Sequence, residues 1–247
     1  MDLKEIEKKI DPYRLILASL IILVIINAPL QGVTDTISSA IIAVAISVGL
    51  DTGITYFKTK KVIWSYGPAI SGLILTLVFS PNLPLYYIAG TAVLAQVLKH
   101  IIRFNNNNIF NPASLAMIIV FLFVPAEVWW GNKLYEALIL GLLVSWRIKR
   151  LPASITFMIA YMVFSIIIVP ETEIQGALDL ALAWVFLAFF MLVEPRTSPR
   201  SLKAQVIYGA LVALIAVVGF AQSWHSPILL GLLIGNAATA FFLSKLK

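Results

Sequence analysis

Apolar residues fall into ten runs along the chain, and most polar and charged residues lie between the runs. The runs cover residues 14–30, 36–56, 63–79, 83–102, 109–125, 134–147, 152–169, 176–193, 204–221 and 226–244. Most are roughly 17–20 residues long, enough for an α-helix to cross the hydrocarbon core of a bilayer. The pattern predicts an all-α polytopic membrane protein with ten transmembrane helices. We expect a single membrane domain over residues 1–247, whose first part, 1–13, is a short cytoplasmic segment.

The composition agrees with this class and excludes several kinds of site. Hydrophobic residues make up 60% of the chain and charged residues 12%, whereas soluble domains have roughly half and a quarter. The chain has no cysteine, which excludes disulfides, thiolate-bound zinc and cysteine-held iron–sulfur clusters within it. It has only two histidines. The sequence therefore predicts no metal site.

Positive charge is distributed unevenly between the two sets of connections. Alternate connections, counted from the N-terminus, carry 17 of the 18 Lys and Arg residues, and the opposite set holds only Lys133 together with six acidic residues. By the positive-inside rule, this predicts a multi-pass protein of the plasma membrane with both termini in the cytoplasm. The basic loops indicate topology and contact with the lipid bilayer rather than nucleic-acid binding.

The ten runs divide into two halves of five, repeat 1 over about 14–125 and repeat 2 over about 134–244. Because five is odd, the second half has inverted orientation, an arrangement that places sites between the repeats. Interruptions at corresponding positions support this inverted 5+5 repeat. The segment LVFSPNLP (77–84) resembles MLVEPRTSP (191–199), and NIFNPASLAM (108–117) resembles LIGNAATAFF (233–242).

These interruptions predict broken helices. Proline lacks a backbone N–H and keeps the preceding residue out of the helical region, and a bilayer tolerates freed backbone groups only inside protein or a wet cavity. A purely structural interpretation stays open, in which the prolines end spans at the interface. In that interpretation Pro112 is a first-turn residue and Asn111 is the N-cap of the fifth span.

Five segments, in order along almost the whole chain, resemble those of the NqrB/RnfD family, the membrane subunits of the sodium-pumping NADH:quinone oxidoreductase and of the Rnf electron-transport complex. The segments are SGLILTLVFSPNLPLY (71–86), NIFNPASLAM (108–117), VSWRIKRLP (144–152), FFMLVEPRTSP (189–199) and LLIGNAATAFF (232–242). Glu194 stands where this family usually has aspartate. The resemblance implies an inverted-repeat fold like that of urea transporters.

The resemblance also implies a flavin, riboflavin or FMN, held non-covalently near the cytoplasmic side. The residues that match the family's Asn-x-x-Asn-Pro element are Asn108, Asn111 and Pro112. Carboxamides suit the edge of an isoalloxazine ring because they both donate and accept hydrogen bonds without carrying charge. We expect the other asparagines of this stretch, 105–107, to form a flexible polar loop.

A second, covalently bound FMN is not expected. The family esterifies it to a threonine in a Ser/Thr-rich external motif after the fifth span. Here that connection is VPAEVWWGNK (124–133), which contains no serine or threonine. The segment DTISSAI (35–41) copies most of the motif but ends in Ile41, which has no hydroxyl to esterify.

Polar residues at the interruptions are candidates for an ion or solute path. The candidates are Ser71, Pro81, Glu194, Pro195, Thr197 and Asn236. An ionisable group in a span is expensive and usually functional, so Glu194 could gate a cation or proton path. The alternative is a surface carboxylate paired in a cytoplasmic loop. Asp51, near the inner end of the second span, is a second charged group of this kind.

Two functions remain in contention. The first is a membrane subunit of an Rnf/Nqr-type ion-translocating complex, with flavin, coupled Na⁺ or H⁺ transport and partner subunits. The second is a free-standing channel or transporter for a small solute or flavin on the same fold. The sequence contains no nucleophile–base pair, phosphate loop or dinucleotide motif. The chain is therefore at most one subunit of an oxidoreductase, and partners would carry out the entry chemistry.

Overall fold

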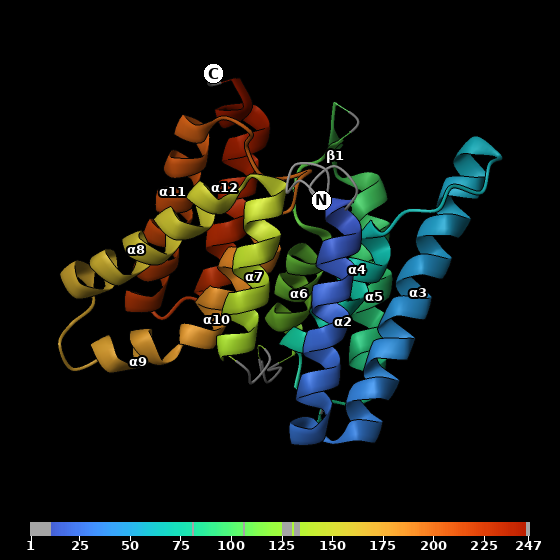
Figure 1. Cartoon of the computed structure of the whole chain (residues 1–247), viewed down its shortest axis with the longest axis horizontal. Coiled ribbons are helices and arrows are strands. Elements are labelled where there is room, and N and C mark those ends of the chain that lie inside the picture. The colour runs from blue at the N-terminus through green and yellow to red at the C-terminus, as the bar shows by residue number, and fades with distance from the viewer. Residues whose placement is uncertain (1–10, 81, 106, 125–129, 131–133, 246–247) are drawn as a thin grey trace, which may run out of the picture.

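The computed structural model describes residues 11–80, 82–105, 107–124, 130 and 134–245, and it is all-helical apart from one two-stranded hairpin (Figure 1). Every apolar run predicted from the sequence contains helix. The elements are α2 (Pro12–Gln31), α3 (Val33–Thr59), α4 (Gly67–Val78), α5 (Leu85–Ile101), β1 (Arg103–Phe104), β2 (Asn107–Asn108), α6 (Pro112–Phe123), α7 (Leu134–Ile148), α8 (Leu151–Ile168), α9 (Ile174–Asp179), α10 (Ala181–Phe186), the π-helical turn η1 (Leu187–Met191), α11 (Leu202–Ala221), α12 (Pro227–Phe241) and the 3₁₀ turn η2 (Leu243–Lys245).

Several helices begin at residues whose side chains satisfy the free N–H groups of the first turn. Asp11 caps α2 by accepting a hydrogen bond from the Tyr13 N–H at 3.1 Å. Ser201 caps α11 through the Ala204 N–H at 3.4 Å. Proline occupies the first turn of α2, α4, α6, α8 and α12, where its missing N–H costs nothing. These local signals determine where the helices start.

The helices fall into a long and a short class. Among the described residues, four helices, α2, α3, α8 and α11, are long and apolar enough to cross a membrane. The shorter apolar helices are α4, α6, the α10–η1 segment and α12. A helix of 12 residues, such as α4 or α6, spans about 18 Å, well short of a bilayer core of about 30 Å. These four shorter apolar helices lie in the runs where the sequence predicted interruptions, although α7, with 15 residues, is as short as α12.

The interrupted segments lie in the middle of the molecule. In α4 every residue from Ile70 to Val78 is buried, and so is every residue from Ala183 through Met191 in α10 and η1. A helix that is apolar on all sides must be enclosed by protein or lipid. The ends of these helical segments, after Val78 and after Met191, are therefore surrounded by other helices. Backbone groups that leave a helix within a membrane require such surroundings.

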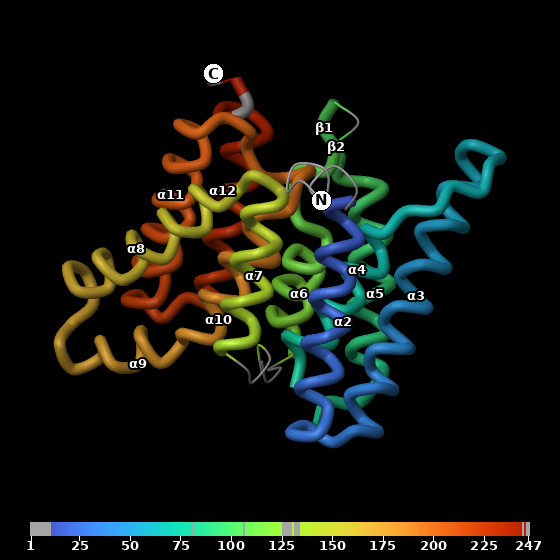
Figure 2. Tube along the Cα trace, in the orientation of Figure 1, coloured from blue at the N-terminus to red at the C-terminus, as the bar shows by residue number. Residues whose placement is uncertain are grey.

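The two halves of the chain form two neighbouring groups of helices (Figure 2). In the first half α3 packs against α4 and α5, and α5 packs against α6; in the second half α8 packs against η1 and α11, and α11 packs against α12. Across the boundary α2 contacts α7, and α6 contacts α12. The chain therefore forms an all-α membrane domain whose central contacts join the two halves.

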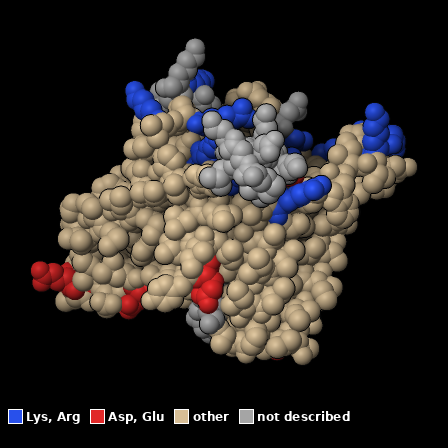
Figure 3. Space-filling model, in the orientation of Figure 1, with Lys and Arg blue, Asp and Glu red and all other residues tan. Residues whose placement is uncertain are grey.

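Charge is segregated between the two ends of the helices (Figure 3). The Lys and Arg side chains gather at the end where α2 begins and α12 ends, and acidic side chains lie toward the opposite end. We refer to the first end as the basic face. This is the charge separation that the sequence predicted, and it places both the start of α2 and the end of α12 at the basic face.

Helices α8 and α11 cross closely because Gly209 lets their backbones approach. A Cβ atom at Gly209 would lie 2.5 Å from the Ala153 carbonyl oxygen, whereas one at Gly53 would meet nothing within 4 Å. Small residues commonly permit such contacts between membrane helices. We expect Gly209→Ala to lower the free energy of unfolding by about 1–3 kcal/mol through overpacking, measured as unfolding in detergent. The matched change Gly53→Ala should be neutral or stabilising, and equal effects of both would contradict this explanation.

Candidate functional site

A cavity of about 690 Å³ opens on the basic face, between elements of the two halves. The β1–β2 hairpin forms one wall, residues 195–201 form another, and the end of α12 forms the third. Its volume lies within the range of small-molecule and cofactor sites. Arg196 and Arg200 line it, and no carboxylate does among the described residues. The cavity therefore suits a ligand of flavin size that is neutral or anionic.

The asparagine-rich stretch forms a wall of this cavity. Arg103 pairs with Asn108 and Phe104 pairs with Asn107 across the antiparallel hairpin, and Asn105, Asn107 and Asn108 line the cavity. Of the residues expected to form a polar loop, 105–107, Asn105 lies in the turn of the hairpin, whereas Asn107 belongs to β2, where cross-strand pairing orders its backbone. Asn108 is buried, with 6% of its surface exposed.

Asn236 joins the two halves at the wall of the cavity. Its Oδ1 accepts a hydrogen bond from the Asn111 N–H at 3.0 Å, and its Nδ2 donates to the Tyr208 hydroxyl at 2.7 Å. All three residues are buried. The Asn236 amide thus connects the start of α6 with α11, and Asn236 also lines the cavity.

Asn111 has the structural role that the sequence left open. Its Oδ1 accepts a hydrogen bond from the Ser114 N–H at 3.1 Å, so Asn111 is the N-cap of α6, and Pro112 is the first helical residue. Asn111 also borders a hollow of only about 20 Å³, together with Ser71, Glu194 and Pro195. A volume of this size holds about one water molecule.

Glu194 lies in the loop after η1, where the chain is no longer helical. Its Oε2 accepts a hydrogen bond from the Thr197 hydroxyl at 3.1 Å. Burial raises the pKa of the Glu194 carboxyl to about 7, because the hydrogen bonds from Thr197 and Asn111 and the positive charges of Arg196 and Lys99 offset only part of the desolvation. Glu194 forms no ion pair with any described residue. A carboxyl of this kind can bind and release a proton near neutral pH.

The structure brings most of the predicted residues together in two adjoining spaces. Asn108, Pro195, Thr197 and Asn236 line the cavity, and Ser71, Asn111, Glu194 and Pro195 border the hollow. Pro112 begins α6 next to Asn111 and lines neither space among the described residues. Pro81 lies outside the described residues, as does most of the external connection 124–133 on which the covalent FMN argument rests.

Several site residues were not found by sequence reasoning. Thr239 lines the cavity, is buried, and has an Oγ1 with no hydrogen-bond partner in the described part of the chain. Thr239 follows Asn236 by three residues on one helix, so the two side chains lie on the same face. That spacing could have identified Thr239 from the sequence. No sequence pattern identified Tyr208 as a site residue, because a tyrosine in an apolar span resembles any core aromatic residue. Its role depends on the distant Asn236.

These observations test whether the cavity fits a flavin. An isoalloxazine edge requires several donors and acceptors beside apolar surface. The walls offer the amide of Asn108, the unpartnered hydroxyl of Thr239 and the apolar side chains of Phe104, Ile109 and Leu243. The residues present fit the group in size and chemistry.

Comparison with known proteins decides the family. The model of the NQR2, RnfD, RnfE family matches residues 11–138, just over half of the chain. The chain belongs to the NQR2, RnfD, RnfE family. The resemblance inferred from the motifs is thereby confirmed. The family match includes Ser71, Asn108 and Asn111, whereas Glu194 and Asn236 lie beyond it. No curated protein matches the chain.

Proposed function

We propose that the protein is a membrane subunit of an Rnf/Nqr-type ion-translocating electron-transport complex, which binds a flavin non-covalently and contributes to coupled cation transport. The observation that carries the proposal is the cavity of about 690 Å³ on the basic face, whose wall includes Asn108 of the family's Asn-x-x-Asn-Pro element. Family membership supports the same assignment. Further subunits of that type would supply electron entry, because the sequence has no dinucleotide motif.

Asn108 and Thr239 would hold the flavin through polar contacts, and Arg196 and Arg200 would favour a phosphate if the flavin is FMN. A bound flavin would supply electron transfer. Asn111 and Pro112 would support the wall of the cavity rather than line it. The Asn111 side chain caps α6, and its N–H donates to Asn236. The chain's own contribution is to hold the ring at the boundary between the two halves.

Cation coupling is supported by the position of Glu194. This carboxyl borders the small hollow directly below the cavity, and Pro195 borders both spaces. A proton or cation bound at Glu194 would therefore lie next to a flavin in the cavity. The basic face would be the cytoplasmic one, in the plasma membrane, by the positive-inside rule.

The inverted five-plus-five repeat is supported by the pattern of helix packing. The α3–α5 and α5–α6 contacts of the first half correspond to the α8–α11 and α11–α12 contacts of the second. Equivalent helices meet across the boundary, α2 with α7 and α6 with α12. Helix α6 runs away from the basic face and α12 runs toward it (Figure 1), as inversion requires.

The alternative, a free-standing channel for a small solute or flavin, is favoured by one observation, the opening of the cavity to the basic face. The space below argues against it in this conformation. The hollow of about 20 Å³ is bordered by Ile16, Ile70, Ile74 and Phe190 as well as the polar residues, and only a water-sized molecule would fit.

The test of the proposed function is a visible absorption spectrum of the detergent-purified protein, recorded before and after acid denaturation. We expect a flavin spectrum in the native sample, and free flavin in the supernatant once the protein is precipitated. A flavin that stays with the polypeptide would contradict non-covalent binding and the predicted lack of a covalent FMN. A colourless protein that also takes up no added riboflavin or FMN would overturn flavin binding.

A further inference from the structure

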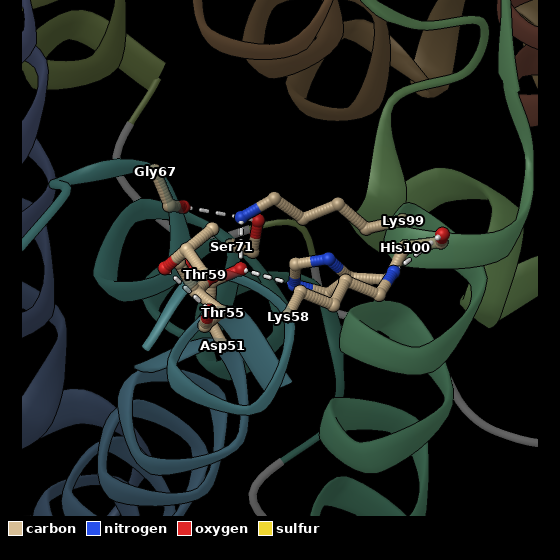
Figure 4. Close-up of polar contacts among 8 residues, drawn as sticks. All are labelled: Asp51, Thr55, Lys58, Thr59, Gly67, Ser71, Lys99 and His100. Atoms are coloured by element: carbon tan, nitrogen blue, oxygen red, sulfur yellow. Dashed lines mark hydrogen bonds and ion pairs between the residues drawn. The ribbon is translucent and has the colours of Figure 1, made fainter. Parts of the chain in front are cut away.

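A second charged cluster lies between α3 and α5, outside the cavity. The Asp51 Oδ1 atom accepts hydrogen bonds from the Lys99 Nζ at 2.6 Å and from the His100 Nε2 at 2.8 Å (Figure 4). Side-chain exposure is only 8% for Asp51 and 9% for Lys99. Ionisable groups buried in a membrane domain are expensive and usually functional.

The Lys99 side chain reaches from this cluster toward α4. Figure 4 shows it extending toward Gly67 and Ser71, and the Ser71 hydroxyl donates to the Gly67 carbonyl oxygen at 3.1 Å. Gly67 and Ser71 border the hollow of about 20 Å³, and Glu194 borders it as well. The charges of Lys99 and Glu194 act on each other. The Lys99 ammonium therefore pairs with Asp51 on one side of the α4 residues that border the hollow, and Glu194 borders the same hollow.

Two carboxyl groups and several cations surround the hollow. With Asp51 and Glu194 ionised, Lys99 charged and His100 neutral, these four groups carry one net negative charge, which the positive charge of Arg196 balances. The other groups that act on Glu194 are Arg196 in its own loop, Tyr13 on α2 and Tyr208 on α11, while Lys58 and Arg196 also act on the cluster. Because the hollow has room for about one water, a proton fits it and a hydrated metal cation does not.

We propose that Asp51, Lys99 and Glu194 form a proton-transfer unit, in which a proton passes between the Lys99 ammonium and the Glu194 carboxylate across the hollow. One Lys99 N–H bond breaks, one Glu194 O–H bond forms, and the opposite charges disappear together. A proton taken up from water restores the ammonium, and release of the proton from Glu194 to water restores the carboxylate. Asp51 holds Lys99 at this position. The proposal rests on the cation-coupling part of the proposed function and identifies the ion as a proton.

The test is a pH titration of the C=O stretching band of protonated Glu194, followed by infrared difference spectroscopy of the purified protein. Glu194→Gln identifies the band, because it should remove it. Lys99→Met removes the neighbouring positive charge and should raise the pH at the midpoint of the Glu194 titration by about 1 unit. Asp51→Asn releases Lys99 toward Glu194 and should lower the midpoint. The matched change Lys58→Met, at an exposed lysine that contacts the His100 carbonyl, should leave it unchanged.

The double variant Asp51→Asn/Lys99→Met covers the case in which a single change leaves an unpaired buried charge and prevents folding. It removes the pair as a unit and should raise the midpoint, as Lys99→Met does. The proton-transfer unit is supported if the two single variants shift the Glu194 midpoint in opposite directions, or if the double variant raises it. A midpoint unchanged by loss of Lys99, or lowered by it, overturns the unit. The Glu194 band is measurable whether or not flavin is bound, so failure of flavin binding would be seen separately.

Discussion

Replacing Asn108 with leucine is expected to weaken flavin binding at least about tenfold. Asn108 is buried in the cavity wall, and leucine keeps its bulk while removing both the donor and the acceptor of the amide. Loss of one well-placed hydrogen bond costs about 1.4 kcal/mol, which corresponds to that factor. The measurement is a titration of purified protein with riboflavin and with FMN, followed by quenching of flavin fluorescence.

The control for this prediction is Asn82→Leu, the same change at an exposed asparagine outside the cavity. It should leave the affinity unaltered. The thermal unfolding midpoint of both variants in detergent should stay close to that of the original protein. If Asn108→Leu bound flavin as tightly as Asn82→Leu, the cavity on the basic face would not be the flavin site.

Replacing Asn236 with leucine is expected to destabilise the protein by about 2–5 kcal/mol. The change removes the acceptor of the Asn111 N–H and the donor to the Tyr208 hydroxyl, and both partners are buried. Each buried polar group left without a partner costs about 1–3 kcal/mol. Unfolding in detergent, followed by tryptophan fluorescence, measures the loss. Flavin binding should weaken as well, because Asn236 links the two halves at the wall of the cavity.

Ser114→Ala provides the control for buried polarity at the same place in the fold. The Ser114 hydroxyl is buried but has no hydrogen-bond partner among the described residues, so its removal should cost little. Tyr208→Phe completes the test as a double-mutant cycle. Alone it should destabilise, and in the Asn236→Leu background it should cost much less. Additive effects of the two changes would show that the hydrogen bond between them contributes nothing.

The fold was predictable from sequence as far as local physics determines it. Each apolar run contains helix, and Asp11 and Asn111 cap helices as their residue types suggest. The interruptions marked by proline and asparagine coincide with the short helices, because proline acts on its own turn of backbone. The segregation of basic residues also followed from counting along the chain. None of these features depends on contacts between distant residues.

The site was only partly predictable, because its chemistry depends on which helices meet. Sequence reasoning found Glu194 and Asn236 by their polarity in apolar surroundings and Asn108 by the family resemblance. It could not show that Asn236 binds Asn111 rather than a ligand. It left Asn111 open between a contact to flavin and the N-cap of α6, and in the structure that side chain caps α6. Asp51 and Lys99 are 48 residues apart and form their ion pair only because α3 packs against α5.

By itself, the sequence determined that this is a helical membrane protein of the Nqr/Rnf type, with its positive charge at one end and short, interrupted segments at two matching places in each half. Hydrophobicity, proline geometry and charge are properties of neighbouring residues, so they can be read along the chain. Only the tertiary structure decided that the asparagine hairpin forms a cavity wall, that Asn236 connects the halves, and that Lys99 pairs with Asp51. Those facts depend on how distant helices pack, and packing is determined by the shape and burial of the whole molecule rather than by any local pattern.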